Sequence, residues 1–179
     1  TGPLSVYGQT KLEGEQAVAQ CQKHLIFRTS WVYAARGGNF AKTMLRLAKE
    51  RDRLTVIADQ MGAPTAAELL ADVTALALRT VRKQPELAGL YHCAASGETS
   101  WHGYACHVLA RARALGLPLK AGPDDVAAIL TSSYPTPAQR PLNSRLNTDK
   151  LEAAFDLHMP HWQVHMNRML DEICGGITQ

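Results

Sequence analysis

The sequence has few cysteines and no long apolar run. Its 179 residues include four cysteines that lie far apart and form no CxxC pair, so neither a zinc cluster nor a dense disulfide framework is indicated. No apolar segment reaches membrane-spanning length, and no basic and apolar leader stands at the front. We therefore expect a cytoplasmic protein with reduced thiols, which is neither exported nor anchored in a membrane.

Concentrated charge is also missing. The formal net charge is +3, and it arises from Lys and Arg scattered along the chain rather than gathered in a block. This distribution argues against nucleic-acid binding and favours a partner that carries a few phosphates. No GxSxG motif occurs, so hydrolysis by a serine nucleophile is disfavoured.

Short apolar segments alternate with amphipathic ones, which predicts an α/β fold with a parallel sheet. The 46% hydrophobic content is sufficient for one sizeable core. Residues 131–148 are rich in loop-forming types. The expected strands are residues 24–33, 53–57 and 89–95. The expected helices are residues 4–22, 40–51, 66–83, 101–117 and 161–174.

The first expected helix carries a Tyr and a Lys one turn apart. At this spacing Tyr7 and Lys11 project side by side, so the ammonium can stabilise a developing phenolate. By itself a YxxxK pair is more often a coincidence than a catalytic device. Gly14 lies on the same face, and a glycine inside a helix suggests that another element approaches closely there.

Five segments in order carry a resemblance to a known family. They are PLSVYGQTKLEGE, HLIFRTSWVYAARGGNFAKTMLRLAKER, DQMGAPTAAELLAD, GLYHCAASGETSWHGYA and YPTPAQRPLNSRLNT. Together they resemble the dTDP-4-dehydrorhamnose reductase family of extended short-chain dehydrogenases/reductases. The resemblance implies a Rossmann-like α/β fold, here its C-terminal part with most of the substrate-binding lobe. It also implies reduction of the C4 keto group of dTDP-4-dehydro-L-rhamnose by hydride from NADPH or NADH.

The resemblance assigns roles to individual residues. Tyr7 would protonate the C4 oxygen, and Lys11 would hold the nicotinamide ribose and stabilise the tyrosinate, so both would contact the cofactor. Trp31 would line the sugar pocket. As a division, the resemblance implies one incomplete unit over 1–179: residues 1–35 hold the catalytic helix and following strand, and 36–179 are mainly the substrate lobe, with some elements returning to the Rossmann sheet.

Further residues match family positions that contact substrate or metal. Asn39 and Phe40 would meet the nucleotide-sugar, although Asn39 is equally well explained as a helix cap. Arg140 would contact the diphosphate or be a plain surface arginine. Glu68 and Glu172 would bind Mg²⁺ at a homodimer contact, with solvated helix charges as the alternative at both positions.

The family's Gly-rich turn, on which the cofactor pyrophosphate rests, has no counterpart in this sequence. We therefore expect the chain to be a C-terminal portion of a reductase that is inactive alone. Two alternatives remain open. One is another nucleotide-sugar reductase or epimerase of the same superfamily, and the other is a non-catalytic binding protein like the regulatory subunit of methionine adenosyltransferase.

Overall fold

The computed structural model describes residues 2–3, 5–134 and 141–175. Helices and short strands alternate along this part of the chain, as the sequence predicts. The α-helices are α1 (Val6–Val18), α2 (Phe40–Glu50), α3 (Ala67–Val81), α4 (Trp101–Ala114), α5 (Asp149–Phe155) and α6 (Trp162–Gly175). The strands are β1 (Leu25–Arg28), β2 (Val32–Tyr33), β3 (Leu54–Ile57), β4 (Met61–Gly62), β5 (Thr65–Ala66), β6 (Gly89–His92), β7 (Thr99–Ser100) and β8 (Val126–Ile129).

Parallel pairing dominates the strands. β1 pairs with β6, β2 with β5 and β3 with β8, all in parallel, whereas β4 and β7 are antiparallel. The predicted α/β fold with parallel strands is therefore confirmed. The single strand expected at 24–33 was wrong, because Trp31 adopts a positive φ of 49° and separates β1 from β2. Neither β8 nor α5 was expected from the sequence.

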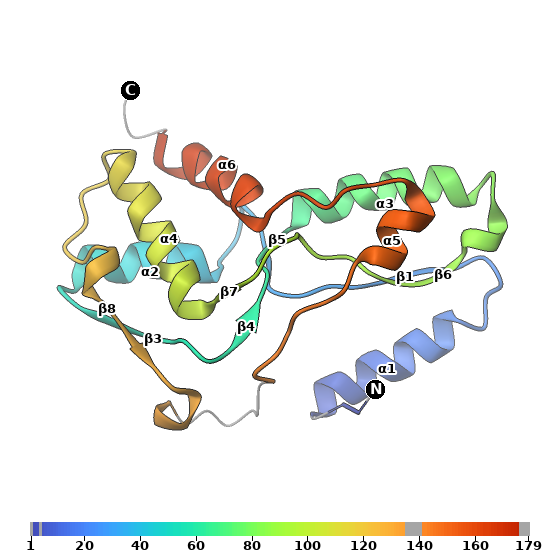
Figure 1. The fold of residues 1–179 in the computed structure, drawn as a ribbon, viewed down its shortest axis with the longest axis horizontal. Helices are drawn as coiled ribbons and strands as arrows, with labels where there is room; N and C mark the ends of the chain where they lie inside the picture. Colours follow the sequence, from blue (N-terminus) through green and yellow to red (C-terminus); the bar gives the residue numbers. More distant parts are fainter. Residues whose placement is uncertain (1, 4, 135–140, 176–179) are drawn as a thin grey trace.

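The elements form two groups along the long axis of the molecule (Figure 1). In one group the β1–β6 pair lies between α1 on one face and α3 and α5 on the other. In the other group α2 and α4 pack together, and α4 also contacts β3 and β8. The predicted helix at 4–22 is shorter than expected and ends at Val18.

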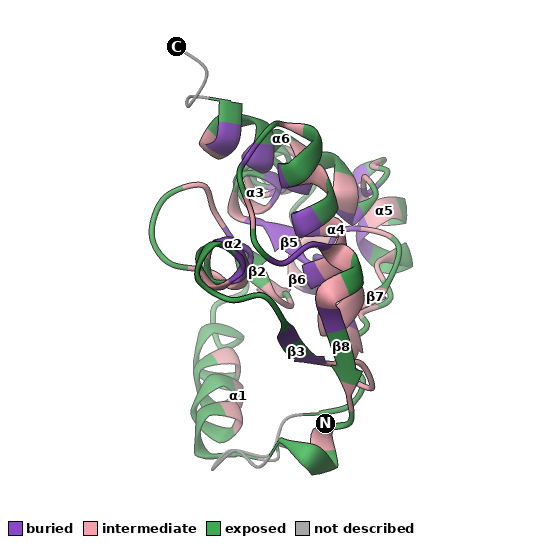
Figure 2. Ribbon diagram, turned by 90° about the vertical axis from the view of Figure 1, so that its left-hand side faces the viewer, coloured by how far each residue is buried: buried purple, intermediate pink, exposed green. Residues whose placement is uncertain are grey.

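One continuous apolar core joins these elements, with α1 outside it. Tyr104 and Leu109 of α4, Leu151 of α5 and Met166 of α6 are almost fully buried within the core. No residue of α1 is buried, and Figure 2 shows this helix as mostly exposed. The free energy that holds α1 in place must therefore come from specific contacts rather than from apolar burial.

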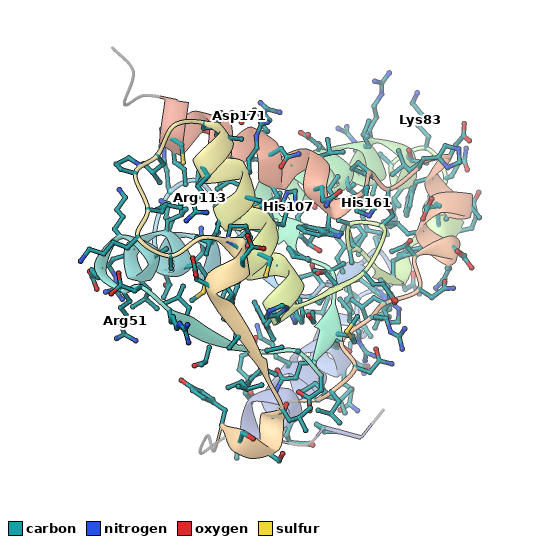
Figure 3. The ribbon with its side chains drawn as sticks, turned by 60° about the vertical axis from the view of Figure 1, so that its left-hand side comes forward. Arg51, Lys83, His107, Arg113, His161 and Asp171 are labelled. Carbon is teal, nitrogen blue, oxygen red and sulfur yellow. The ribbon has the colours of Figure 1, made fainter. Side chains whose placement is uncertain are left out.

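Helices α4 and α6 are joined by polar contacts as well as by the core. The ring of His107 lies where α4 faces α6 (Figure 3), and its Nε2 is 2.8 Å from Asn167 Oδ1. Gln163 Nε2 lies 3.2 Å from the other ring nitrogen, Nδ1. Burial of the ring lowers the pKa of His107, so the folded chain favours the neutral imidazole.

All four cysteines are free thiols, as the sequence predicts. In the part of the chain that the structure describes, no helix is both long and apolar enough to cross a membrane.

Candidate functional site

Tyr7 and Lys11 lie together on the solvent-facing side of α1. Ser5 caps this helix, since its side-chain oxygen accepts a hydrogen bond from Gly8 N at 3.1 Å. The Tyr7 side chain is 71% exposed, and Lys11 Nζ lies 5.6 Å from the centre of the Tyr7 ring. The helix therefore brings the ammonium beside the phenol, as the i and i+4 spacing predicts.

An ion pair joins this helix to the β1–β6 pair. Arg28, the last residue of β1, donates from Nη2 and Nε to the two carboxylate oxygens of Glu15, at distances of 2.6 to 3.2 Å. The hydrogen bonds from Arg28 lower the pKa of the Glu15 carboxyl. Glu15 lies on the half-buried side of α1, so this contact holds against β1 the helix that presents Tyr7 and Lys11 to solvent.

The close approach expected at Gly14 is not seen among the described residues. A Cβ built at Gly14 would have no heavy atom within 4 Å. Gly62 shows the opposite: a Cβ there would lie 2.7 Å from Cε2 of Trp31. The glycine that makes room for a site residue is therefore Gly62, in β4.

Trp31 follows the carboxyl end of β1 and is stacked on a second tryptophan. Its ring centre is 3.9 Å from that of Trp101, with 20° between the ring planes. Trp101 also contacts Phe40, at 4.7 Å between centres. Sequence reasoning identified Trp31 and Phe40 but missed Trp101, because nothing in the sequence shows that the first residue of α4 faces the end of β1.

Asn39 acts as the cap of α2. Its Oδ1 accepts from Lys42 N at 2.9 Å, and its Nδ2 donates to Ala34 O at 2.7 Å. The cap predicted from the sequence is therefore confirmed. Since both ends of this amide already have partners within the chain, Asn39 shapes the site through the start of α2, directly before Phe40.

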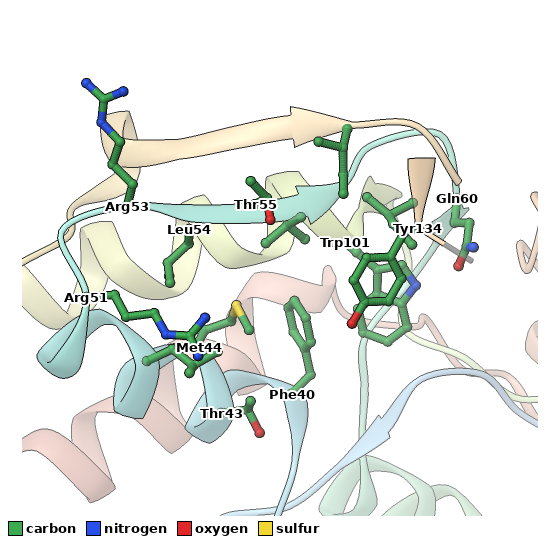
Figure 4. Close-up of a pocket in the computed structure, with 14 residues that line it drawn as sticks. Phe40, Thr43, Met44, Arg51, Arg53, Leu54, Thr55, Gln60, Trp101 and Tyr134 are labelled. Atoms are coloured by element: carbon green, nitrogen blue, oxygen red, sulfur yellow. The ribbon is translucent and has the colours of Figure 1, made fainter. Parts of the chain in front are cut away.

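A pocket of about 540 Å³ opens between α2 and the β3–β8 pair. Trp101 and Tyr134 lie toward one end and Arg51 and Arg53 toward the other, with Phe40 between them (Figure 4). Of the described residues that line the pocket, none is Asp or Glu. Aromatic and apolar walls combined with unopposed guanidinium groups suit a ligand that has both ring systems and negative charge.

A buried amide and an aspartate lie beside this pocket. Gln60, which lines it, is 3% exposed and donates from Nε2 to Thr131 Oγ1 at 3.1 Å. The Thr131 hydroxyl and backbone N–H in turn donate to the carboxylate of Asp59. These bonds lower the pKa of Asp59 and link β3 to the segment after β8, so the pocket wall is held by polar contacts that sequence reasoning did not find.

Glu68 and Glu172 lie apart from the pocket lining described above. Glu68 is exposed in the first turn of α3, and Glu172 is exposed near the end of α6. Among the described residues, no group of three or more His, Cys, Asp and Glu side chains could hold a metal ion. Arg140 lies outside the described residues.

The chain is similar in sequence to a known protein family. Residues 1–174 match the family model described as the RmlD substrate binding domain. The dTDP-4-dehydrorhamnose reductase of Escherichia coli K12 is 59% identical over 174 residues, covering 97% of this chain and 58% of the relative. The reductase of Streptomyces griseus is 34% identical over 98% of this chain and 56% of its own length. The chain thus spans somewhat over half the length of these relatives.

Solved structures agree in fold. The dTDP-4-dehydrorhamnose reductase of Clostridium acetobutylicum superposes with a TM-score of 0.82 at 34% identity, covering 97% of this chain and 57% of that one. The Bacillus anthracis reductase, solved in complex with NADP, gives 0.77 at 33% identity, over 99% and 57%. A UDP-glucuronic acid 4-epimerase from Bacillus cereus gives 0.64 at 18% identity, over 99% and 55%, which is a likeness of fold alone. These neighbours are in line with the fold expected from the sequence.

Proposed function

The chain belongs to the RmlD substrate-binding domain family, and we propose that it supplies the catalytic helix and the substrate lobe of an NAD(P)H-dependent dTDP-4-dehydrorhamnose reductase. The exposed pair of Tyr7 and Lys11 on α1 carries this proposal. A phenol beside an ammonium can give up a proton and leave a stabilised phenolate. That is what reduction of a ketone requires, since the oxygen at C4 must gain a proton as its carbon gains hydride.

The residues around Lys11 fit a nicotinamide cofactor in part. Lys11 is exposed, and within the described residues no carboxylate pairs with it, so its ammonium is available to ribose hydroxyls. When bound, the reduced nicotinamide would supply the hydride. The sequence offers no Gly-rich turn between a strand and a helix for the pyrophosphate, so that part of the cofactor would rest on residues outside this chain.

The pocket beside α2 supports a nucleotide-sugar as the substrate. The side chains of Phe40 and of β3 provide apolar surface for ring systems, and the guanidinium groups of Arg51 and Arg53 match phosphate oxygens. In this proposal Trp31 and Phe40 border the sugar and Asn39 sets the start of α2 behind them. We further propose that Arg140 contacts the diphosphate.

We also propose that the chain divides between a Rossmann part and a substrate lobe. Residues 1–35 would supply the catalytic helix α1 and the following strand β1 of a Rossmann sheet, and 36–179 would form mainly the substrate lobe, with some elements returning to that sheet. The position of β6 beside β1 supports the return of later elements to that sheet.

The residues present do not fit Mg²⁺, because Glu68 and Glu172 stand on separate helices without further ligands among the described residues.

The test is a reductase assay on a completed enzyme. This chain would be joined to the N-terminal part of the Escherichia coli relative, and NADPH oxidation would be followed with dTDP-4-dehydro-L-rhamnose. Tyr7→Phe should lower the rate by roughly 10²–10⁴-fold, the usual contribution of a general acid. Gln16→Ala, an exposed neighbour on α1, should leave it unchanged.

Two results would count against the proposal. A completed enzyme that keeps its rate after Tyr7→Phe would remove the catalytic assignment and leave a binding role. Turnover of a UDP-sugar in place of the dTDP-sugar would move the chain to another nucleotide-sugar enzyme of the same superfamily.

A further inference from the structure

Trp101 joins two parts of the site that the sequence presents separately. Its indole stacks face to face on Trp31, at 3.9 Å and 20°, and it lines the pocket together with Phe40 and Tyr134. Both indoles are half-buried, so the stacked pair retains surface that a ligand can cover. Of the two indoles, Trp101 lines the pocket and Trp31 does not, so Trp101 is the ligand-facing side of the stack and Trp31 lies behind it.

The conformation of Trp31 depends on its neighbours. Its φ of 49° lies in the left-handed region, which is costly for a bulky residue and persists only where surrounding contacts enforce it. Two such contacts hold the ring. Trp101 lies against one side of the indole, and the bare Cα of Gly62 leaves room that a Cβ would fill.

The position of the stack indicates which part of a ligand it would meet. Trp31 lies three residues after Arg28, the carboxyl end of β1, and ligands of parallel α/β sheets bind at the carboxyl ends of the strands. The arginines Arg51 and Arg53 lie at the opposite end of the pocket (Figure 4). Phosphates would therefore lie toward the arginines, and the uncharged reacting sugar would lie toward the tryptophans.

We propose that Trp101 contacts the deoxysugar of the substrate and is also the positioning residue that holds Trp31 in its stacked orientation. This inference rests on the proposed function, in which Trp31 borders the sugar. The apolar face of a deoxyhexose, with its methyl group, can pack on an indole face in the way that other apolar groups do. Trp101 would thus favour ligands that carry the sugar over the bare nucleotide.

Calorimetry on the 179-residue chain with two ligands tests the sugar contact. We expect dTDP-L-rhamnose to bind more tightly than dTDP. Trp101→Leu should weaken dTDP-L-rhamnose by roughly tenfold, the order of a lost aromatic contact, and leave dTDP unchanged. Trp162→Phe is the matched control, because Trp162 is a buried indole that does not line the pocket.

Circular dichroism of the tryptophans tests the positioning role without removing an indole. Gly62→Ala should displace Trp31 and diminish the circular dichroism signal of the stacked tryptophans. It should also lower the preference for dTDP-L-rhamnose over dTDP several-fold. Gly14→Ala, where an added Cβ meets nothing within 4 Å, should change neither. The far-ultraviolet spectrum reports whether each variant is folded. If Trp101→Leu does not fold, Gly62→Ala is used in its place in the calorimetry with dTDP-L-rhamnose and dTDP.

The inference is overturned if the unmodified chain does not prefer dTDP-L-rhamnose, or if Trp101→Leu weakens both ligands equally or neither. It is also overturned if Gly62→Ala leaves both the signal and the preference intact. These outcomes are separate from failure of the proposed function. A completed enzyme that reduces dTDP-4-dehydro-L-rhamnose would retain that function even if Trp101 made no contact with the sugar.

Discussion

Arg28 at the end of β1 holds Glu15 of α1 through three hydrogen bonds of 2.6, 2.9 and 3.2 Å. Both side chains are partly shielded from water, at 28% and 19% exposure, so this pair is screened less than an exposed one. Since α1 buries none of its residues, the ion pair has a larger share in docking this helix than it would have in a helix with an apolar face.

Arg28→Ala should loosen α1 while leaving the core folded. We expect a loss of about 1 kcal/mol in the local stability of the helix, the upper range for pairs that are not fully buried. Amide hydrogen exchange of residues 6–18 measures it. Arg46→Ala, which breaks the exposed pair with Glu50, is the control and should change little.

The same pair gives a dependence on acid. The pKa of Glu15 is lowered from its ordinary 4.5 in the folded chain, so the pair stabilises the fold above that value, and this contribution is lost as the pH falls through the lowered pKa. Glu15→Gln should flatten the fall in helix protection below about pH 4.5. An unchanged acid profile would show that Glu15 is not the group responsible.

We expect a second pH dependence of stability from His107, at the contact between α4 and α6. Burial, with Arg111 and His161 nearby, lowers its pKa below 6.5, against the opposing hydrogen bond with Asn167. The unfolded chain therefore takes up a proton first, and stability should decrease as the pH falls from about 7 to 5. His107→Gln should reduce this slope in urea unfolding, and His158→Gln, on a fully exposed ring, should not.

Gly14→Ala should stabilise the chain by up to about 1 kcal/mol, because alanine favours a helix interior over glycine and nothing crowds this position. Urea unfolding measures the change. The completed reductase provides a sharper comparison. Loss of its activity in the stabilised variant would show that an element outside the described residues approaches Gly14, as the sequence suggests.

The thiols should react at very different rates. Cys21 is exposed, whereas burial raises the pKa of Cys93 to about 11 and also raises that of Cys174. The thiolate is the reactive form, so mass spectrometry after brief alkylation should find Cys21 modified first. Fast labelling of Cys93 or Cys174 in a Cys21→Ser variant would contradict the burial of these two thiols.

The sequence by itself determined the local features of this protein. The i and i+4 spacing placed Lys11 beside Tyr7, the residue type of Asn39 predicted the cap of α2, and apolar periodicity located most helices and the strands β1, β3 and β6. These features depend on neighbours within one or two turns, which a sequence pattern contains. The resemblance of its motifs then identified the family.

Only the tertiary structure decided which distant residues meet. The stack of Trp31 on Trp101, the space at Gly62 and the bond between Arg28 and Glu15 join segments from different elements, and no local pattern encodes such contacts. The pocket arginines were missed for the same reason, since Arg51 follows α2 and acquires its surroundings only when β3 and β8 pair beside it. Backbone geometry and packing, rather than residue type, turned these side chains into a site.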